Sequence, residues 1–368
     1  MWYVINKQNG QKLIKFKKKV IVPLFEYMVK YKSESRSDKF VDFLEEISIE
    51  TNRKFIDCDK KLHRHNLESI KNKKQILEQR VQDTKILKYI CKRVVNRVRF
   101  ADCVDLLLST YTKLQLQMHM YVYYTQNKEL KKRKSFIKEQ EVPNEWNYIF
   151  KVFFYEKFFA MTQIWEQIDG YSYNRDMFHE NFKADNAIFV CPYCDSSDIS
   201  DNGNLEVEHF WPESKYPFLS MNPLNLYSSC KACNRSAAGK GTKTFNPITL
   251  PFYECIGDGV KFRPDVAERK IHINGRTLAI DNYIKLINLE NRYSQKSKYR
   301  IVEILTSTIY ATIKELENHG QVVSDEDIEK YISAKIEPKV QPHYFVVSDI
   351  LRDYSKYLGF INSRNGIE

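Results

Sequence analysis

Four cysteines form two C-x-x-C pairs, at Cys191 and Cys194 and at Cys230 and Cys233, with 35 residues between the pairs. Each pair can place two sulfurs on one side of a tight turn, and two pairs supply the four thiolates of a tetrahedral Zn²⁺ site. Four unrelated buried cysteines are the alternative, but two pairs within one short stretch argue against coincidence. A redox motif would need a single pair beside a βαβ unit. The spacing therefore predicts a zinc site whose long spacer holds a further element.

A zinc ion bound by four cysteines keeps no open position for water, so it stabilises structure and the chemistry must lie elsewhere. Between the pairs, the segment LEVEHFWP alternates apolar and polar residues and predicts a short strand that carries Glu208 and His209. A lone histidine is more often structural than catalytic. Here, however, Asn225 follows within the spacer and Asn234 comes directly after the last cysteine.

The segment RSAAGKGTK follows Asn234 and contains Arg235, Lys240 and Lys243. Such cations can contact phosphates, although a solvated surface is an equally good interpretation for any one of them.

An acidic residue and His on a strand, followed by N-L-x4-C-x-x-C-N and a Gly/Lys segment, resembles the HNH endonucleases with the ββα-metal fold. The resemblance covers residues 190–245, about a seventh of the chain, and the three letters correspond to His209, Asn225 and Asn234. It implies a small α+β module in which the zinc knuckles clamp a β-hairpin carrying His209 against a helix beginning near residues 230–234.

The resemblance also implies a mechanism for hydrolysing phosphodiester bonds of DNA. His209 would act as the general base towards the attacking water, and Glu208 and Asn234 would hold one Mg²⁺ or Mn²⁺ ion by oxygen ligands. Asn225 would orient the loop that carries the histidine. The family often has Asp before the histidine, and this chain has Glu208, whose carboxylate reaches one methylene further. Glu206, two residues earlier on the same face of the strand, could share the ion.

The elements that must position these residues are mainly helical. Helical periodicity predicts one helix over residues 71–100, a long helix over 101–130 that ends in the cationic cluster 128–134, and a buried helix over 145–168 closed by Gly170. After residue 264 the pattern is helical again, with a stop at Gly320 and a helix start at Ser324. We therefore expect a mainly α fold with a small α+β insert, divided into a basic helical region (1–180), the HNH module (181–264) and a C-terminal helical region (265–368).

The charge of the 368-residue chain is uneven. The net charge is +11, and residues 1–180 hold 35 Lys and Arg against 23 Asp and Glu, so the N-terminal half carries the whole excess. A basic surface favours a polyanionic partner, and we expect region 1–180 to bind double-stranded DNA through its phosphates. Docking to a protein partner through its aromatic-rich helices is the alternative.

The segment from Ile280 to Leu305, which includes LINLENRY, resembles helices that follow the HNH core in bacterial anti-phage nucleases of the Septu type. Those nucleases work with an ATPase partner, so the resemblance implies a role in defence and a partner of that kind.

Other classes of protein fit the sequence less well. The cysteines do not form a secreted disulfide framework, no signal peptide opens the chain, and no apolar run reaches membrane-spanning length, so we expect a cytoplasmic protein without membrane association. Two further hypotheses remain: a non-catalytic, zinc-stabilised nucleic-acid-binding module, in which Glu208 and His209 are incidental, and a protein-interaction scaffold.

Overall fold

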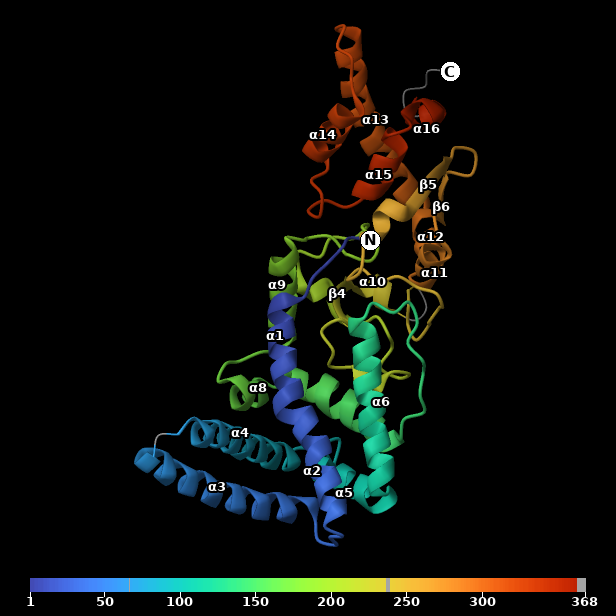
Figure 1. The fold of residues 1–368 in the computed structure, drawn as a ribbon. Coiled ribbons are helices and arrows are strands. Elements are labelled where there is room, and N and C mark those ends of the chain that lie inside the picture. The colour runs from blue at the N-terminus through green and yellow to red at the C-terminus, as the bar shows by residue number, and fades with distance from the viewer. Residues whose placement is uncertain (66, 236–238, 363–368) are drawn as a thin grey trace.

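The computed structural model describes residues 1–65, 67–235 and 239–362. The molecule is elongated, with a helical hairpin at one end, a central region that holds the cysteines and a C-terminal group of helices at the other end (Figure 1). The expected fold class, mainly α with a small α+β insert, is confirmed. Three two-stranded antiparallel sheets are present in the described part of the chain.

The N-terminal half is built from helices that pack on a shared apolar core. α1 continues without a break through a π-helical turn, η1, into α2, and α3 and α4 form the long hairpin at the lower end of Figure 1. The elements are α1 Lys7–Phe16, η1 Lys17–Ile21, α2 Val22–Ser33, α3 Phe40–His65, α4 Glu68–Cys91, β1 Val94–Val95, β2 Val98–Arg99, α5 Phe100–Thr110, α6 Lys113–Lys131, α7 Asn144–Asn147, η2 Tyr148–Lys157, η3 Phe158–Ala160, α8 Thr162–Asp169 and α9 Arg175–Asn186.

Two of the predicted helices are shorter than expected. The helix predicted over 71–100 ends at Cys91, and the valines that continue its pattern form the hairpin β1–β2 instead. Asn96 and Arg97 both have positive φ at the turn, the backbone that suits a two-residue hairpin loop. The helix predicted over 101–130 is broken before α6, where Thr112 forms a capping box with Gln115.

The helix predicted over 145–168 is buried, as expected, but it is not one α-helix. Its centre, η2, is π-helical, and a 3-10 turn separates it from α8, which ends at Gly170 in the left-handed conformation. Tyr148 and Lys151 lie on η2, and Phe150 and Phe154 pack in the core. π-Helical segments are rare and often occur at functional sites, and η2 contacts the functional module directly.

The central and C-terminal elements follow. Strands β3 and β4 form one hairpin, and β5 and β6 form another. The helix start expected at Ser324 and the helix stop expected at Gly320 are both confirmed. The elements are η4 Asn202–Asn204, β3 Leu205–His209, η5 Pro217–Leu219, β4 Leu226–Cys230, α10 Lys231–Asn234, η6 Ile256–Gly259, β5 Val260–Asp265, β6 Lys270–Gly275, α11 Leu278–Leu286, α12 Leu289–Tyr293, α13 Lys296–Asn318, α14 Asp325–Lys335, α15 Tyr344–Leu351, η7 Tyr354–Tyr357 and α16 Leu358–Asn362.

The expected boundaries at 180 and 264 fall inside α9 and β5, respectively. α9 contacts both β3 and β4, so the N-terminal helices and the central module share packing rather than a linker. The division into three domains stays a prediction. Of the helices in the described residues, not one combines the length and the apolar character that crossing a bilayer requires.

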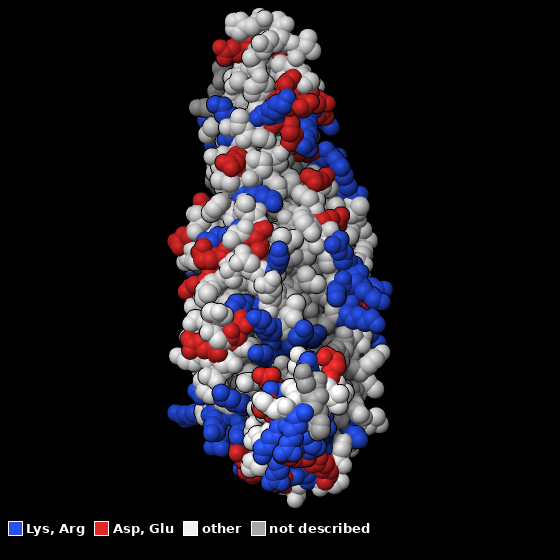
Figure 2. Space-filling view, turned by 60° about the vertical axis from the view of Figure 1, so that its left-hand side comes forward, with Lys and Arg blue, Asp and Glu red and all other residues white. Residues whose placement is uncertain are grey.

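The surface carries mixed charge. Figure 2 shows Lys and Arg side chains gathered mainly over the lower half of one face, interspersed with Asp and Glu. Some basic side chains of the N-terminal half are paired locally, for example where Arg36 contacts Asp38 and Glu46.

Candidate functional site

The four cysteines of the two C-x-x-C pairs come together in the structure. Their sulfur atoms lie within 4.8 Å of one another, all four residues are buried, and none forms a disulfide. The Sγ atoms of Cys191 and Cys233 are 3.8 Å apart, and those of Cys194 and Cys230 are 4.0 Å apart. A tetrahedral zinc ion with Zn–S bonds of about 2.3 Å requires S–S separations of about 3.8 Å, so the donor set fits Zn²⁺.

The C-terminal helices provide positive charge to this cluster. Arg292 on α12 is buried, and its Nη1 atom lies 3.1 Å from Cys233 Sγ, while its Nη2 atom donates to the carbonyl of Ala232. Lys298 on α13 donates to the carbonyl of Ser196 at 2.8 Å. Because four thiolates and one Zn²⁺ sum to two negative charges, a guanidinium at this position compensates a buried anion.

The hairpin β3–β4 connects the cysteine cluster to the histidine. Leu205 pairs with Cys230 at one end, and His209 pairs with Leu226 at the other. The predicted strand around Val207 is confirmed, and the single turn of α10 begins directly after Cys230. The cluster therefore fixes one end of the hairpin, and His209 lies at the other end.

Three of the four predicted catalytic residues line one pocket. Glu208, His209 and Asn234 surround a cavity of about 240 Å³ together with Lys151, Pro212, Glu213, Ser214, Lys240, Gly241 and Thr242. Asn225 is not among the residues that line it. The residues come from β3, the loop that follows it, α10, the segment after α10 and the π-helical η2.

Both ring nitrogens of His209 face oxygen atoms. Nε2 lies 3.0 Å from the carbonyl oxygen of Ser220, and Nδ1 lies 2.5 Å from Oε2 of Glu213. Burial raises the pKa of Glu213, but the hydrogen bond and charge of His209 outweigh it, so the pKa falls to about 2. The ring of Tyr155 packs against the imidazole with centroids 4.1 Å apart. The orientation of His209 is thus determined by the loop and by η2.

The carboxylate of Glu208 is buried and paired with a buried lysine. Lys240 Nζ lies 2.6 Å from Glu208 Oε1, and both side chains are at most 5% exposed. Burial raises the pKa of Glu208 to about 7, against the opposing effect of the ammonium. The segment before Lys240 packs closely on Cys233 because residue 239 is a glycine: a Cβ atom there would lie 2.1 Å from the carbonyl oxygen of Cys233.

Asn234 contacts the carboxylate of Glu206 and lines the same pocket as Glu208. Its Nδ2 atom donates to Glu206 Oε2 at 2.6 Å. A carboxylate only accepts hydrogen bonds, so this contact assigns the orientation of the Asn234 amide and makes Oδ1 the atom that could ligate a cation. Glu206 lines a neighbouring cavity with Arg175 and His179 and does not line the pocket of Glu208.

Asn225 holds the loop between the two strands. Its Oδ1 accepts from the backbone nitrogen of Trp211 at 2.7 Å, and its Nδ2 donates to the carbonyls of Trp211 and Leu219 at 3.0 and 3.2 Å. These bonds connect Trp211 with Leu219 across the loop segment that contains Glu213. The supporting role of Asn225 stays a prediction.

The predicted phosphate contacts occupy different environments. Arg235 is exposed, whereas Lys240 is buried on Glu208 and lies inside the pocket rather than on an open surface. Lys243 is exposed and donates to the carbonyl of Gly239. Their contact with nucleic acid stays a prediction.

Sequence reasoning missed Glu213, Lys151 and the Ser220 carbonyl. Glu213 stands four residues after His209, beyond a proline, and this spacing outside a helix carries no periodic signal. Lys151, whose Nζ is 3.6 Å from Glu213 Oε1, comes from a distant element, and no pattern in the sequence connects the two.

The chain is similar to two curated proteins over part of its length. Protein ea31 of Escherichia phage lambda is 23% identical over 174 residues, covering 42% of this chain and 56% of that protein. Septu protein PtuB of Bacillus thuringiensis is 35% identical over 71 residues, covering 19% of this chain and 27% of that protein. The chain thus matches about half of one relative and about a quarter of the other. No protein-family model and no solved structure matches.

The site defines a class rather than a particular protein. A buried four-cysteine cluster with the chemistry of a structural zinc site joins a short ββα-like element to a pocket with acid, imidazole and amide groups. This cluster and the partial similarity to the Septu protein are both compatible with a nuclease of the HNH type.

Proposed function

We propose that the chain is a metal-dependent HNH endonuclease that hydrolyses phosphodiester bonds of DNA, with a role in anti-phage defence. The observation that carries the proposal is that Glu208, His209 and Asn234 line one pocket at the end of the β3–β4 hairpin. The partial similarity to the Septu protein PtuB supports the defence role, and an ATPase partner is part of the same proposal.

In this proposal His209 removes a proton from water through Nδ1. The Ser220 carbonyl lies against Nε2, so it keeps a proton on that nitrogen and leaves the Nδ1 lone pair for the water. Glu213 now contacts Nδ1, so its carboxylate must move before a water molecule can take that place. Lys151 lies on the other side of Glu213 and offers the displaced carboxylate an ammonium partner.

Glu208 and the Oδ1 atom of Asn234 would hold a divalent cation, since carboxylate and amide oxygens are the ligands that Mg²⁺ and Mn²⁺ prefer. Such an ion supplies electrostatic stabilisation of the phosphate and the leaving oxygen. Lys240 neutralises Glu208 in the structure, and the lysine must share or leave the carboxylate when the cation binds.

Nicking of supercoiled plasmid tests the proposal. We expect the purified protein to convert supercoiled DNA to the open-circular form with Mg²⁺ and to lose this activity with EDTA. His209→Ala should lower the rate by about 10²–10⁴-fold, the usual contribution of a general base. His63→Ala, at an exposed histidine on α3, is the matched control and should cut like the parent.

Equal nicking by the parent and by His209→Ala would refute the assignment of the base. An absence of nicking by the parent, with retained DNA binding, would instead favour the non-catalytic zinc-stabilised module. DNA binding through phosphates by the N-terminal half should weaken steeply with added salt.

A further inference from the structure

A second cavity lies outside the site, between the N-terminal helices and the loop that holds His209. It has a volume of about 670 Å³, within the range of pockets that bind small organic ligands. α1, η1 and α6 form one side of it, and residues 218–224 form the other. In Figure 1, α1 and α6 run alongside the central module that carries β4 and α10.

The floor of this cavity is apolar and partly aromatic. Leu13, Ile21, Tyr123 and Phe218 are buried and line it, whereas Tyr124 is 39% exposed. An accessible aromatic ring beside an apolar floor offers a stacking surface for a flat ligand.

The rim is strongly cationic. Five lysines line the cavity, and no aspartate or glutamate is among its lining residues: Lys7, Lys17, Lys18, Lys128 and Lys131. None of the five has a carboxylate partner within 4.0 Å among the described residues. Burial, and to a lesser extent the nearby charge of Lys131, lower the pKa of Lys17.

Lys17 connects the charge to the rings. Its Nζ lies 5.4 Å from the ring centre of Tyr123 and 5.6 Å from that of Tyr124. A ligand that stacks on Tyr124 would therefore place an attached anionic group beside the ammonium. Gln11 adds an amide group to the same lining, which suits the polar edge of a base. The amides of Asn6, Asn127 and Asn222 also line the cavity but are hydrogen-bonded within the protein.

We propose that this cavity binds a nucleotide, with the base against Tyr124 and the phosphates among the lysines. A single carboxylate on an apolar tail would leave most of the five lysines without a partner, whereas a nucleotide supplies several negative charges, a flat ring and hydrogen-bonding edges together. The nucleotide is either part of a DNA strand or a free molecule.

The cavity shares a wall with the candidate active site. Met221 lines the cavity, and the carbonyl of the preceding Ser220 contacts His209. Asn222 donates to Asn127 on α6 at 2.7 Å, and Asn127 donates to the carbonyl of Phe218 at 3.2 Å. A ligand there lies one residue from the contact that orients the imidazole. The binding itself is independent of the proposed nuclease activity.

Two variants of different kinds test the site, both in a His209→Ala background so that DNA is not cut. Gly10→Leu fills the cavity: Gly10 lines it, and an added Cβ would meet only Pro223 at 3.8 Å, an ordinary contact that the fold tolerates. Lys17→Gln with Lys131→Gln removes two charges. Lys113→Gln, an exposed lysine on α6 away from the cavity, is the control.

The probes are a fluorescent N-methylanthraniloyl derivative of ATP and a short oligothymidylate. We expect saturable binding to the parent, loss of that binding in Gly10→Leu, a weakening of about tenfold or more in the double lysine variant, and no change in Lys113→Gln. Displacement of the fluorescent nucleotide by the oligothymidylate assigns the site to a DNA strand. Displacement by unlabelled ATP alone assigns it to a free nucleotide.

The proposal is overturned if neither probe binds at about 1 mM, a concentration that fills even a weak specific site. It is also overturned if Gly10→Leu and the double lysine variant bind the probes as the parent does. Because the readout is binding, a failure of plasmid nicking would not affect this result, and a failure of binding would not affect the nicking result.

Discussion

Replacing Arg292 should loosen the cysteine cluster without touching a cysteine. Arg292→Met keeps a side chain of similar length but removes the guanidinium that donates to Cys233 Sγ at 3.1 Å and to the Ala232 carbonyl. A hydrogen bond from a charged donor contributes about 1.5–3 kcal/mol when its partner stays buried. Outer contacts of this kind change metal affinity by about 10–100-fold, which corresponds to about 1.4–2.8 kcal/mol, so the two estimates agree.

We therefore expect Arg292→Met to bind Zn²⁺ about 10–100-fold more weakly than the parent. The assay is competition with a chromophoric chelator such as 4-(2-pyridylazo)resorcinol, with metal content measured in parallel by mass spectrometry. The zinc affinity of Arg292→Lys should lie between those of the parent and of Arg292→Met, since lysine retains the positive charge but lacks the planar guanidinium. Arg276→Met, at an exposed arginine that precedes α11, is the matched control and should leave the affinity unchanged.

Equal zinc affinity in Arg292→Met and Arg276→Met would refute the reasoning, because it would mean that the cluster needs no compensation from α12. A loss of zinc in both variants would point instead to general destabilisation of the C-terminal helices. The affinity of Arg292→Lys separates the two explanations, because only charge compensation predicts partial rescue.

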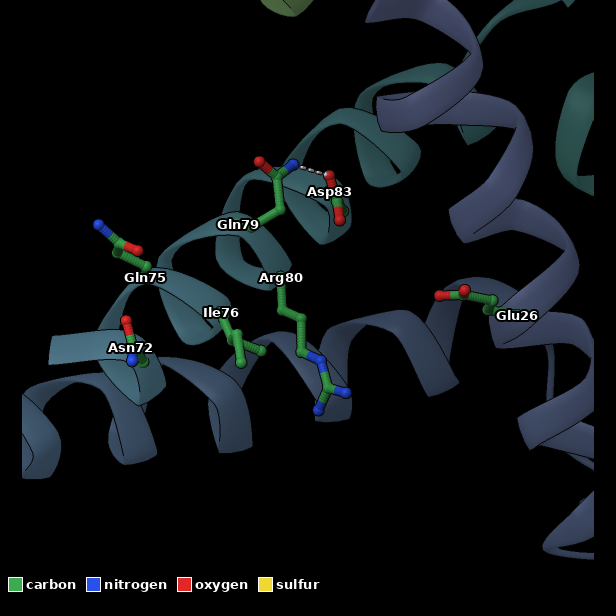
Figure 3. Close-up of a pocket in the computed structure, with 7 residues that line it drawn as sticks. All are labelled: Glu26, Asn72, Gln75, Ile76, Gln79, Arg80 and Asp83. Atoms are coloured by element: carbon green, nitrogen blue, oxygen red, sulfur yellow. Dashed lines mark hydrogen bonds between the residues drawn. The ribbon is translucent and has the colours of Figure 1, made fainter. Parts of the chain in front are cut away.

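Two further predictions concern stability. Asn225→Ala should lower the unfolding free energy by about 3 kcal/mol, which is about 1 kcal/mol for each of its three hydrogen bonds. Urea denaturation measures this loss, with Asn274→Ala at an exposed position as the control. A loss no larger than that of the control would contradict the role of Asn225. Burial raises the pKa of Asp83 from 3.8 to about 6, although the hydrogen bond from Gln79 opposes this rise (Figure 3). The folded state therefore binds an extra proton between these two pH values, and its stability falls as the pH rises from about 4 to 6. Asp83→Asn should therefore gain about 1–3 kcal/mol on the parent between pH 4 and pH 7, and a constant difference, or an equal gain in exposed Asp102→Asn, would exclude this cause.

The parts of the site that depend on local spacing could be predicted from the sequence. Two C-x-x-C pairs predict a shared thiolate cluster whatever the structure of the residues between them, because each pair forms its own turn. Alternation around Val207 predicts the strand that carries Glu208 and His209. Both features depend on residues that are close together in the sequence, and the structure contains both.

The parts that depend on distant packing could not be predicted. The pairing of Lys240 with Glu208 depends on the close approach of Gly239 to Cys233, a contact created only when the segment after α10 folds back. The helix predicted over 71–100 failed for a related reason: valines suit helix and strand patterns alike, and the turn at Asn96 decides between them. Local propensity is overridden where a turn or a tertiary contact is worth more.

The histidine is held from two sides that differ in chemistry. On one side, the cysteine cluster fixes the start of β3 through its pairing with β4. On the other, η2 supplies Tyr155, whose hydroxyl donates to the Val207 carbonyl, and Phe150, whose carbonyl accepts from Ser220 Oγ at 3.1 Å. A ββα element of this size buries too little apolar surface to orient a catalytic group alone. The π-helix of the N-terminal half therefore supports the site as the cysteine cluster does, and a fragment that begins at residue 181 would lose the contacts between η2 and the elements that hold His209.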